Sequence, residues 1–313
     1  MIRNSKISIV IPCYNEEGNI VVLFEKLKSI LSEELFEIVF VDDNSKDNTL
    51  SIIQKIALSD NRVKYLSFSR NFGHQNALRA GLEYAEGDCV ISMDADLQHP
   101  PELLPELILK WRDGFEIVIT LRKDTVNIPF YKKITAHYFY RIINYLSDIN
   151  IQQGSADFRL LDRKVVDVLV YEISEYHLFY RGLVSWLGFN QCSVEYIPNK
   201  RFSGTSKYTF RKMLSFAVDG ITSFSIKPLK VATFIGFIFS ILSALYGFYA
   251  LYMALFTSQT IKGWSSVLMS VVFIGGINLI VLGIIGEYIG KIYFEIKGRP
   301  KYIVSKSNIE NRR

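Results

Sequence analysis

Two long uncharged segments near the C-terminal end restrict the fold of this chain more than any other feature. Val231–Phe256 contains 26 residues without a charge, and Ser265–Gly286 contains a further 22. A helix needs roughly 20 apolar residues to cross the hydrocarbon core of a bilayer. Because helices buried in globular cores rarely extend so far without a charged residue, we predict a transmembrane hairpin rather than two core helices.

The net charge of +5 is unevenly distributed along the chain. Residues 1–220 carry 26 Lys and Arg against 28 Asp and Glu, a net charge of −2; residues 221–313 carry 10 against 3, a net charge of +7. With 49% apolar residues, this composition excludes a disordered chain or a disulfide scaffold. It also argues against a uniformly basic nucleic-acid binder, so no nucleic acid is expected as a partner.

Basic residues flank the apolar segments where these join the rest of the chain. Lys227 and Lys230 precede the first segment and four basic residues follow the second, whereas Lys262 alone lies between them. The positive-inside rule therefore predicts a multi-pass protein of the cell (inner or plasma) membrane, with the N-terminal domain and the C-terminus in the cytoplasm. The N-terminal residues form no apolar h-region, so a cleaved signal peptide is not expected.

Short apolar segments alternate with segments of helical periodicity over the first 120 residues. We expect strands at 7–11, 37–41, 63–67, 89–93 and 117–120, and helices near 17–32, 48–59, 74–86 and 101–112. This alternation is typical of an α/β domain with a mostly parallel sheet covered on both faces. Ligands of such sheets bind beyond the carboxyl ends of the strands. No Gly-x-Gly-x-x-Gly or P-loop motif occurs, which excludes the usual dinucleotide and P-loop sites.

Two aspartates follow the fourth expected strand. Asp94 and Asp96 are two residues apart, so their carboxylates project to the same side and into one cleft. Mg²⁺ is commonly held by one or two carboxylates while substrate phosphates complete its shell. Solvated turn aspartates are the alternative, but the polar clusters that follow other strands favour a metal site.

Several motifs in order resemble those of the family 2, GT-A-fold glycosyltransferases. They are IVIPCYNEEGNI, FVDDNSKDNT, SRNFGHQNALRAGL and ISMDADLQHPPE, followed by GSADFRLLDRKVVD and RFSGTSKYTFRK. Together with the two apolar segments they cover essentially residues 5–300 and are similar to the polyprenyl-phosphate sugar transferases. That group includes the dolichol-phosphate mannose synthases and the bactoprenol glucosyltransferases, and the two-span hairpin fits the bactoprenol branch best.

The resemblance implies a donor site and a metal site. Residues expected to hold the donor nucleotide are Pro12, Tyr14, Asn15, Glu16, Asp43, Asn44, Gln75 and Asp94. Residues expected at the metal are Asp94, Asp96 and Gln98. The implied cofactor is Mg²⁺ or Mn²⁺, and oxygen ligands agree with either ion. His74 is interpreted equally well as a contact to the donor or as part of a solvated helix start.

Asp157 is expected to act in catalysis beside Asp94 and Asp96. A lipid monophosphate has a second pKa near 6 and is already an anion at neutral pH, so Asp157 need not remove a proton. It could orient a substrate or simply pair with an arginine, and both interpretations remain open. Residues expected to bind the acceptor or donor phosphate are Arg122, Lys132, Lys133, Arg201, Ser206 and Lys207.

These observations predict five parts of the chain and one reaction. The parts are a GT-A domain at 1–205, an amphipathic juxtamembrane helix at 206–228, membrane helices at 229–257 and 264–288, and a basic tail at 289–313. The expected reaction is inverting transfer of a sugar, glucose from UDP-glucose first, to undecaprenyl phosphate. Other donors stay open: UDP-N-acetylglucosamine, GDP-mannose and UDP-aminoarabinose. A processive polysaccharide synthase and an inactive membrane scaffold are the rival functions, and the resemblance also suggests a homo-oligomer.

Overall fold

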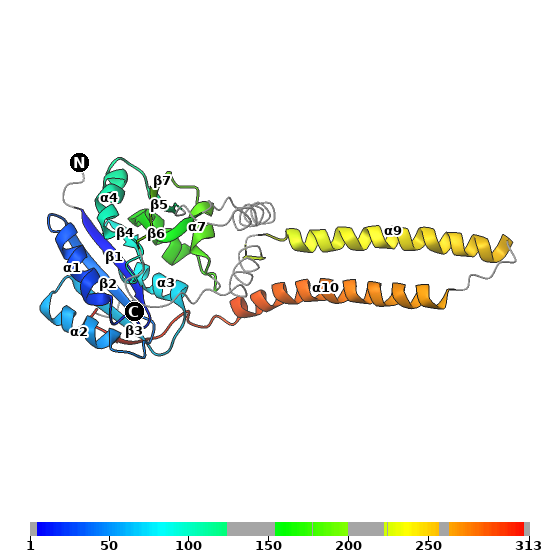
Figure 1. Ribbon diagram of the computed structural model, residues 1–313, viewed down its shortest axis with the longest axis horizontal. Helices are drawn as coiled ribbons and strands as arrows, with labels where there is room; N and C mark the ends of the chain where they lie inside the picture. Colours follow the sequence, from blue (N-terminus) through cyan, green and yellow to red (C-terminus); the bar gives the residue numbers. More distant parts are fainter. Residues whose placement is uncertain are drawn as a thin grey trace.

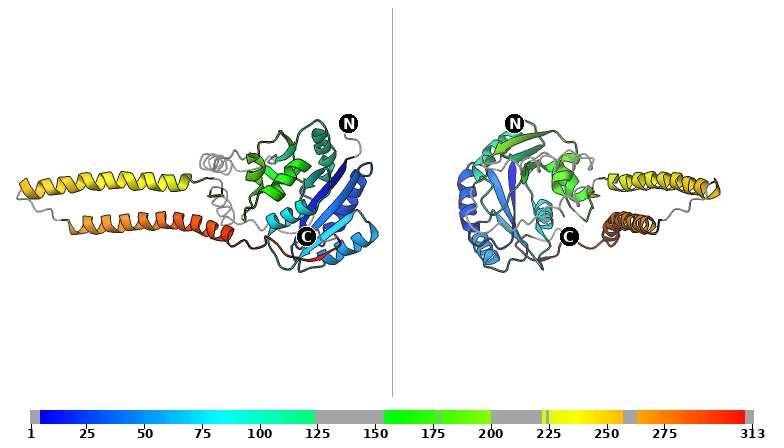
Figure 2. Two further views of the ribbon diagram at one scale, coloured as in Figure 1. Left: turned by 180° about the vertical axis from the view of Figure 1, so that it is seen from behind. Right: turned by 45° about the vertical axis from the view of Figure 1, so that its right-hand side comes forward.

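The computed structural model describes residues 5–123, 154–176, 178–199, 222–223, 225–256 and 263–309. An α/β domain lies at one end of the molecule, and a long helical hairpin projects from it (Figure 1). Helices α3 and α7 lie on the side of the domain nearest the hairpin, and α1 and α2 lie on the far side (Figure 2).

The described part of the domain is built on one mixed sheet of eight strands in the order β7-β5-β6-β4-β1-β2-β3-β8. The strands are β1 (Lys6–Cys13), β2 (Leu35–Asp42), β3 (Val63–Phe68), β4 (Cys89–Ser92), β5 (Ile117–Arg122), β6 (Ser155–Asp162), β7 (Gln191–Tyr196) and β8 (Val304–Ser307). Strands β4, β1, β2 and β3 run parallel, while β6 is antiparallel to both β4 and β5. The five strands expected in the first part of the chain are confirmed.

Helices cover both faces of the sheet because side chains alternate between faces along each strand. Ile7, Ile9 and Ile11 of β1 pack in one core with α1 (Ile20–Ile30), α2 (Thr49–Ser59) and α4 (Leu104–Arg112). Val10 faces the opposite core, which contains α3 (His74–Tyr84), α6 (Arg163–Asp167), the π-helical turn η2 (Val168–Glu172) and α7 (Tyr180–Trp186). A short 3₁₀ turn, η1 (Pro101–Leu103), leads into α4.

The antiparallel strand β6 was not expected from the sequence. Its register pairs Cys89 with Asp162 and Ser92 with Arg159, so it enters the sheet beside the end of β4. Continued by two residues, that register brings Asp157 opposite Asp94. The hydroxyl of Ser92 donates to the carbonyl of Asp157 at 2.6 Å and holds the start of β6 at this edge.

The hairpin consists of α9 (Lys227–Phe256) and α10 (Trp264–Ile296). Both helices are long and apolar enough to cross a membrane, and none of the tested apolar window of either is buried within the protein. At 1.5 Å per residue they extend about 45 and 50 Å, which exceeds the roughly 30 Å core of a bilayer. Helix α9 begins two residues before the expected span at 229–257 and ends within it, whereas α10 begins with the expected span at 264–288 and continues eight residues beyond it.

The segment after α10 belongs to the expected basic tail, but it is not separate from the domain. It returns to the domain, where β8 pairs antiparallel with β3. Tyr302 stacks on Phe68 with ring centroids 5.1 Å apart, and its hydroxyl donates to Glu83 at 2.6 Å. The Asn308 side chain accepts from the amide of Tyr65 at 2.7 Å. The sheet is thus completed by residues more than 200 positions away in the sequence, a pairing that no local pattern encodes.

Candidate active site

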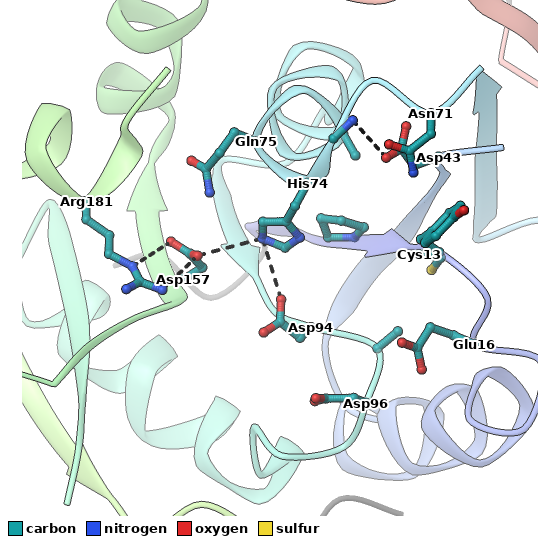
Figure 3. Close-up of a pocket in the computed structure, with 15 residues that line it drawn as sticks. Cys13, Glu16, Asp43, Asn71, His74, Gln75, Asp94, Asp96, Asp157 and Arg181 are labelled. Atoms are coloured by element: carbon teal, nitrogen blue, oxygen red, sulfur yellow. Dashed lines mark hydrogen bonds and ion pairs between the residues drawn. The ribbon is translucent and has the colours of Figure 1, made fainter. Parts of the chain in front are cut away.

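The carboxyl ends of β1, β2 and β4 and the beginning of β6 surround a cleft with a volume of about 550 Å³. Polar loops follow these strands because hydrogen bonding ends there, so loop backbone and side chains face the cleft. The residues that line it are Pro12, Cys13, Tyr14, Glu16, Asp43, Asn71, Gly73, His74, Gln75, Ala77, Asp94, Ala95, Asp96, Asp157 and Arg181. Figure 3 shows this cleft with its polar side chains directed inward.

His74 lies at the centre of the cleft, at the start of α3. Its Nε2 atom is 3.7 Å from an oxygen of Asp94 and 3.7 Å from an oxygen of Asp157 (Figure 3). The imidazole is 42% exposed on its side-chain surface. Of the two interpretations of His74, the geometry favours contact within the site, because the ring stands between two carboxylates of the cleft.

Asp157 is bound by two arginines. Arg159 donates to its Oδ1 atom at 2.7 Å, and Arg181 donates to its Oδ2 atom at 3.1 Å. Burial would raise the pKa of Asp157, but the charge of Arg181, followed by those of Arg159 and His74, holds it well below its usual range. Asp157 therefore stays ionised at neutral pH and is unsuited to act as a general base.

Asp94 is positioned by a histidine that sequence reasoning did not single out. The amide of Asp94 donates to Nδ1 of His99 at 3.0 Å, so Nε2 of that ring carries the proton and lies 3.7 Å from Oδ2 of Asp94. The ring of His99 is buried and stacks on Phe158 with centroids 5.1 Å apart. Packing thus orients the histidine, and the histidine orients the carboxylate.

Asp96 is 8% exposed, and its Oδ1 atom accepts from the amide of Gln98 at 3.0 Å. Leu97, between Asp96 and Gln98, has a positive φ of 62°. L residues rarely adopt this conformation, and it often marks a functional site. This tight turn presents Asp94 and Asp96 to the same cleft. Their oxygens suit a hard divalent cation that takes its remaining ligands from substrate phosphates and water.

No group of three or more His, Cys, Asp and Glu side chains that could hold a metal occurs among the described residues. A site supplied by two carboxylates fits an ion that enters together with a phosphorylated substrate, rather than one bound permanently by protein ligands alone.

Asp43 organises the opposite wall of the cleft. Its carboxylate accepts from the amides of Phe72 at 2.6 Å and of Gly73 at 2.9 Å, which ties the loop after β2 to the loop before α3. Burial raises the pKa of Asp43, and the two amides oppose that shift. Gly73 has a φ of 95°, where a glycine is favoured.

The structure gathers only part of the predicted site. Eight predicted residues line the cleft: Pro12, Tyr14, Glu16, Asp43, Gln75, Asp94, Asp96 and Asp157. Asn15, Asn44, Gln98 and Arg122 are not among the residues that line it. Asn15 and Asn44 have φ angles of 57° and 59° and shape the loops instead; the Asn15 side chain accepts from the amide of Lys46 at 2.7 Å. Lys132, Lys133, Arg201, Ser206 and Lys207 lie outside the described residues.

Arg181 of α7 is the other functional residue that sequence reasoning missed. The sequence offers one local indication of its importance: Arg181 is the single charged residue in the segment 178–187. Such a residue needs a buried partner, but the sequence does not say which one.

A doubly covered, Rossmann-like sheet with an Asp-x-Asp turn after a central parallel strand defines a GT-A glycosyltransferase domain. The chain belongs to glycosyl transferase family 2, which matches residues 8–170, and the "GtrB C-terminal hairpin" matches residues 227–292. The resemblance noted in the motifs is thereby confirmed, and the protein is a glycosyltransferase.

Curated relatives match the chain over nearly its whole length. It is 48% identical to "Uncharacterized glycosyltransferase YkcC" of Bacillus subtilis, over 100% of this chain and 98% of that protein. It is 44% identical to the "SfII prophage-derived bactoprenol glucosyl transferase" of Shigella flexneri, over 98% and 99%. A match to a solved structure of glucosyl-3-phosphoglycerate synthase from Mycobacterium tuberculosis covers 71% of this chain and 78% of that one, with 18% identity and a TM-score of 0.47.

Proposed function

We propose that the protein transfers glucose from a nucleotide donor to the phosphate of a long polyprenyl lipid, giving a lipid-linked sugar for glycosylation of the cell envelope. The observation that carries this proposal is the cluster of Asp94, Asp157 and His74 in the cleft of a domain joined to an apolar hairpin. The full-length match to a bactoprenol glucosyl transferase supports glucose as the sugar and a polyprenyl phosphate as the acceptor.

The reaction needs no general base from the protein. A phosphate monoester is largely a dianion at neutral pH, so its oxygen attacks the anomeric carbon directly. The bond from that carbon to the nucleotide diphosphate breaks on the opposite face, and the configuration is inverted. Asp157, ionised and paired with Arg181, orients His74 and the substrates instead of accepting a proton. Of its two interpretations, we therefore favour the one in which Asp157 orients the substrates, and its pairing with arginines serves that role.

The donor enters with its nucleoside against the wall formed by Pro12, Tyr14, Glu16 and Asp43. UDP-glucose is the expected donor, since it supplies glucose with a diphosphate leaving group. Glu16 is itself held, because its Oε2 atom accepts from the side-chain amide of Asn19 at 2.6 Å.

Mg²⁺ or Mn²⁺ fits the carboxylates of Asp94 and Asp96, because both ions prefer oxygen ligands. When bound, the ion stabilises the negative charge of the departing diphosphate. The chain's own contribution is to present two aspartates in a fixed turn, with His99 holding the first of them.

The proposed location is the cell membrane, with the catalytic domain and the C-terminal segment together on the cytoplasmic side. Pairing of β8 with β3 supports this arrangement, because two membrane crossings return the chain to the side from which it started. The basic residues flanking both helices support the cytoplasmic assignment. We also expect a homo-oligomer, as in the family that the motifs resemble.

Transfer of radiolabelled sugars tests the proposal. Membranes that contain the protein should move label from UDP-glucose to undecaprenyl phosphate in the lipid phase, in a reaction that needs Mg²⁺ or Mn²⁺. UDP-N-acetylglucosamine, GDP-mannose and UDP-aminoarabinose are tested in parallel, and transfer from one of these would change the sugar but not the reaction. Label in a polymer would indicate a processive synthase. No label with any donor would indicate an inactive scaffold and contradict the proposal.

A further inference from the structure

A second hollow adjoins the catalytic cleft and shares part of its wall. Its volume is also about 550 Å³, and it shares Asn71, Gly73, His74 and Gln75 with the cleft. Its remaining wall comes from the segment that precedes α3, from Tyr176, Leu178 and Phe179, from Ser223 near the start of the hairpin, and from Lys301 of the C-terminal segment. The hollow thus lies between the donor site and the membrane helices.

The wall shared with the cleft is the beginning of helix α3. The first amides of an α-helix have no acceptor within the helix, and the helix dipole places partial positive charge there. Helix α3 has 11 residues. Asp43 accepts from the amides of Phe72 and Gly73 just before it, but the cap residue Gly73 has no side chain for the amides of the first turn. Arg70 adds a full positive charge to the same wall and lies over the ring of Phe72 at 4.2 Å. This end of the hollow is therefore suited to an anion.

Lys301 supplies a second full charge and is an independent indication of a ligand. Its Nζ atom is buried, and it has no hydrogen-bond partner among the described residues. Burial, followed by the charge of Arg79, lowers the pKa of Lys301 to about 8. A buried ammonium without a partner is costly, and a bound anion would remove that cost.

Three carboxylates face Lys301 from the elements around it and would weaken its attraction for an anion. Two of them are engaged elsewhere: Glu83 accepts from the hydroxyl of Tyr302 at 2.6 Å, and Glu295 accepts from the amide of Tyr176 at 2.7 Å. Burial and the charge of Glu295 raise the pKa of the third, Glu175. None of the three accepts a hydrogen bond from Nζ of Lys301 among the described residues, so the ammonium donors remain open to a ligand despite the nearby negative charge.

Two residues of the hollow's wall contact the base of the hairpin. Lys291 of α10 donates to the hydroxyl of Ser223 at 3.0 Å, and Tyr176 stacks on Phe294 of the same helix with centroids 5.5 Å apart. These contacts hold one rim of the hollow against the end of α10 that leaves the membrane. The phosphate of a lipid embedded beside the hairpin would meet this rim before the catalytic cleft.

We propose that the hollow between the start of α3 and Lys301 binds the phosphate of the lipid acceptor, so that the segment beyond the second membrane helix forms part of the acceptor site. The inference rests on the proposed function and adds two residues to it, Arg70 and Lys301. Neither was among the predicted phosphate-binding residues.

Steady-state kinetics of the full chain test this inference. The protein is placed in phosphatidylcholine vesicles with undecaprenyl phosphate and UDP-glucose, the proposed donor. Lys301→Gln should raise the KM for the lipid acceptor at least about tenfold, as expected for loss of a charged hydrogen bond. The kcat and the KM for the donor should change less than about twofold. Lys301→Arg should restore most of the acceptor affinity.

Matched variants separate this effect from damage to the fold. Lys306→Gln removes an exposed lysine of β8 in the same segment and should leave all constants unchanged. Arg70→Gln lies outside that segment and should raise the acceptor KM independently of Lys301→Gln. An acceptor KM within twofold of the wild type in both Lys301→Gln and Arg70→Gln overturns the inference, as does a loss confined to kcat.

Two sources of lipid phosphate are distinguished by the vesicles. If the hollow binds the acceptor, the effect of Lys301→Gln appears in pure phosphatidylcholine. An effect that appears only when phosphatidylglycerol is added would assign the hollow to an anionic membrane lipid and overturn the inference. If the wild type labels no polyprenyl phosphate with any donor, the proposed function fails and this inference fails with it. If the wild type labels polyprenyl phosphate but the acceptor KM is unchanged in Lys301→Gln and Arg70→Gln, the inference is refuted and the proposed function stands.

Discussion

The carboxylate of Asp157 lies 3.1 Å from the guanidinium of Arg181, although the two residues come from different elements, β6 and α7. Arg159 approaches the same carboxylate at 2.7 Å from within β6. Two cations on one carboxylate keep it ionised and fixed in orientation. The site thus holds an ionised carboxylate, unsuited to act as a general base, 3.7 Å from His74.

Asp157→Asn should lower kcat/KM at least about a hundredfold and also destabilise the fold. Removal of the Asp157 carboxylate leaves Arg159, which is 2% exposed, without its charged partner. Breaking a buried ion pair costs about 3 kcal/mol or more. Because the pKa of Asp157 is depressed in the folded protein, its stabilisation is present above pH about 4 and is lost as the pH falls further. Urea unfolding of both proteins at pH 7 and at about pH 2 measures this difference. Equal stability at pH 7 would refute the structural part of the prediction.

Asp96→Asn should reduce transfer at least about a hundredfold and leave the fold intact, because one oxygen of the proposed metal ligand pair becomes a neutral amide. Treatment of the wild type with EDTA should abolish labelling of the lipid, and Mg²⁺ or Mn²⁺ should restore it. Asp113→Asn, which replaces an acid at the end of α4, is the matched control and should remain active. Full activity of Asp96→Asn would exclude the metal role.

A cluster of charges at the opposite end of the sheet predicts a pH-dependent stability. Lys6 and Lys64 approach Glu86 at 2.8 and 2.7 Å, and these hydrogen bonds lower the pKa of Glu86 to about 2. The lowered pKa means that the stabilisation is complete above pH about 5 and declines toward pH 2. Glu86→Gln should therefore melt at a lower temperature than the wild type at pH 7, and the gap should narrow steadily below pH 5. A gap independent of pH would contradict this assignment.

Loss of contacts at Tyr302 or Asn308 should loosen the C-terminal segment from the sheet. Tyr302→Phe removes the hydroxyl that donates to Glu83 and should cost about 1 kcal/mol. Asn308→Ala removes bonds to the backbone of β3 and should act similarly. Hydrogen exchange of the β3 amides should become faster in both variants. Lys306→Ala, on the exposed edge of β8, is the control and should leave exchange unchanged.

The proposed topology predicts which lysines are accessible from outside the cell. A membrane-impermeant maleimide should label Lys262→Cys, between the two helices, in intact cells. Lys306→Cys should be labelled only after the membrane is permeabilised, because β8 pairs with the catalytic domain. Labelling of both positions in intact cells would exclude a cytoplasmic domain.

The sequence predicted the first five strands and the helices between them because their apolar residues recur with the periods of strand and helix. The expected helix at 74–86, for example, corresponds to α3 at His74–Tyr84. The Asp94 and Asp96 pair was equally visible, since its spacing and its position after a strand are local properties. Eight of the predicted site residues line the cleft for the same reason.

His99 and Arg181 could not be assigned in this way. His99 acts because Phe158, about 60 residues later, packs on its ring. Arg181 acts because β6 brings Asp157 to it across the domain. Each function depends on a contact between distant segments, and neither residue belongs to a motif with a fixed spacing.

By itself, the sequence determined the alternation of strands and helices, the two apolar segments long enough for a membrane, and the order of motifs that identifies the family. Those features depend on the local periodicity and composition of the chain. Only the tertiary structure decided that β8 joins the sheet, that Asp157 is held by two arginines, and that Lys301 reaches a hollow beside α3. These arrangements arise from the free energy of packing, hydrogen bonding and charge pairing between segments far apart in the chain, which local patterns do not encode.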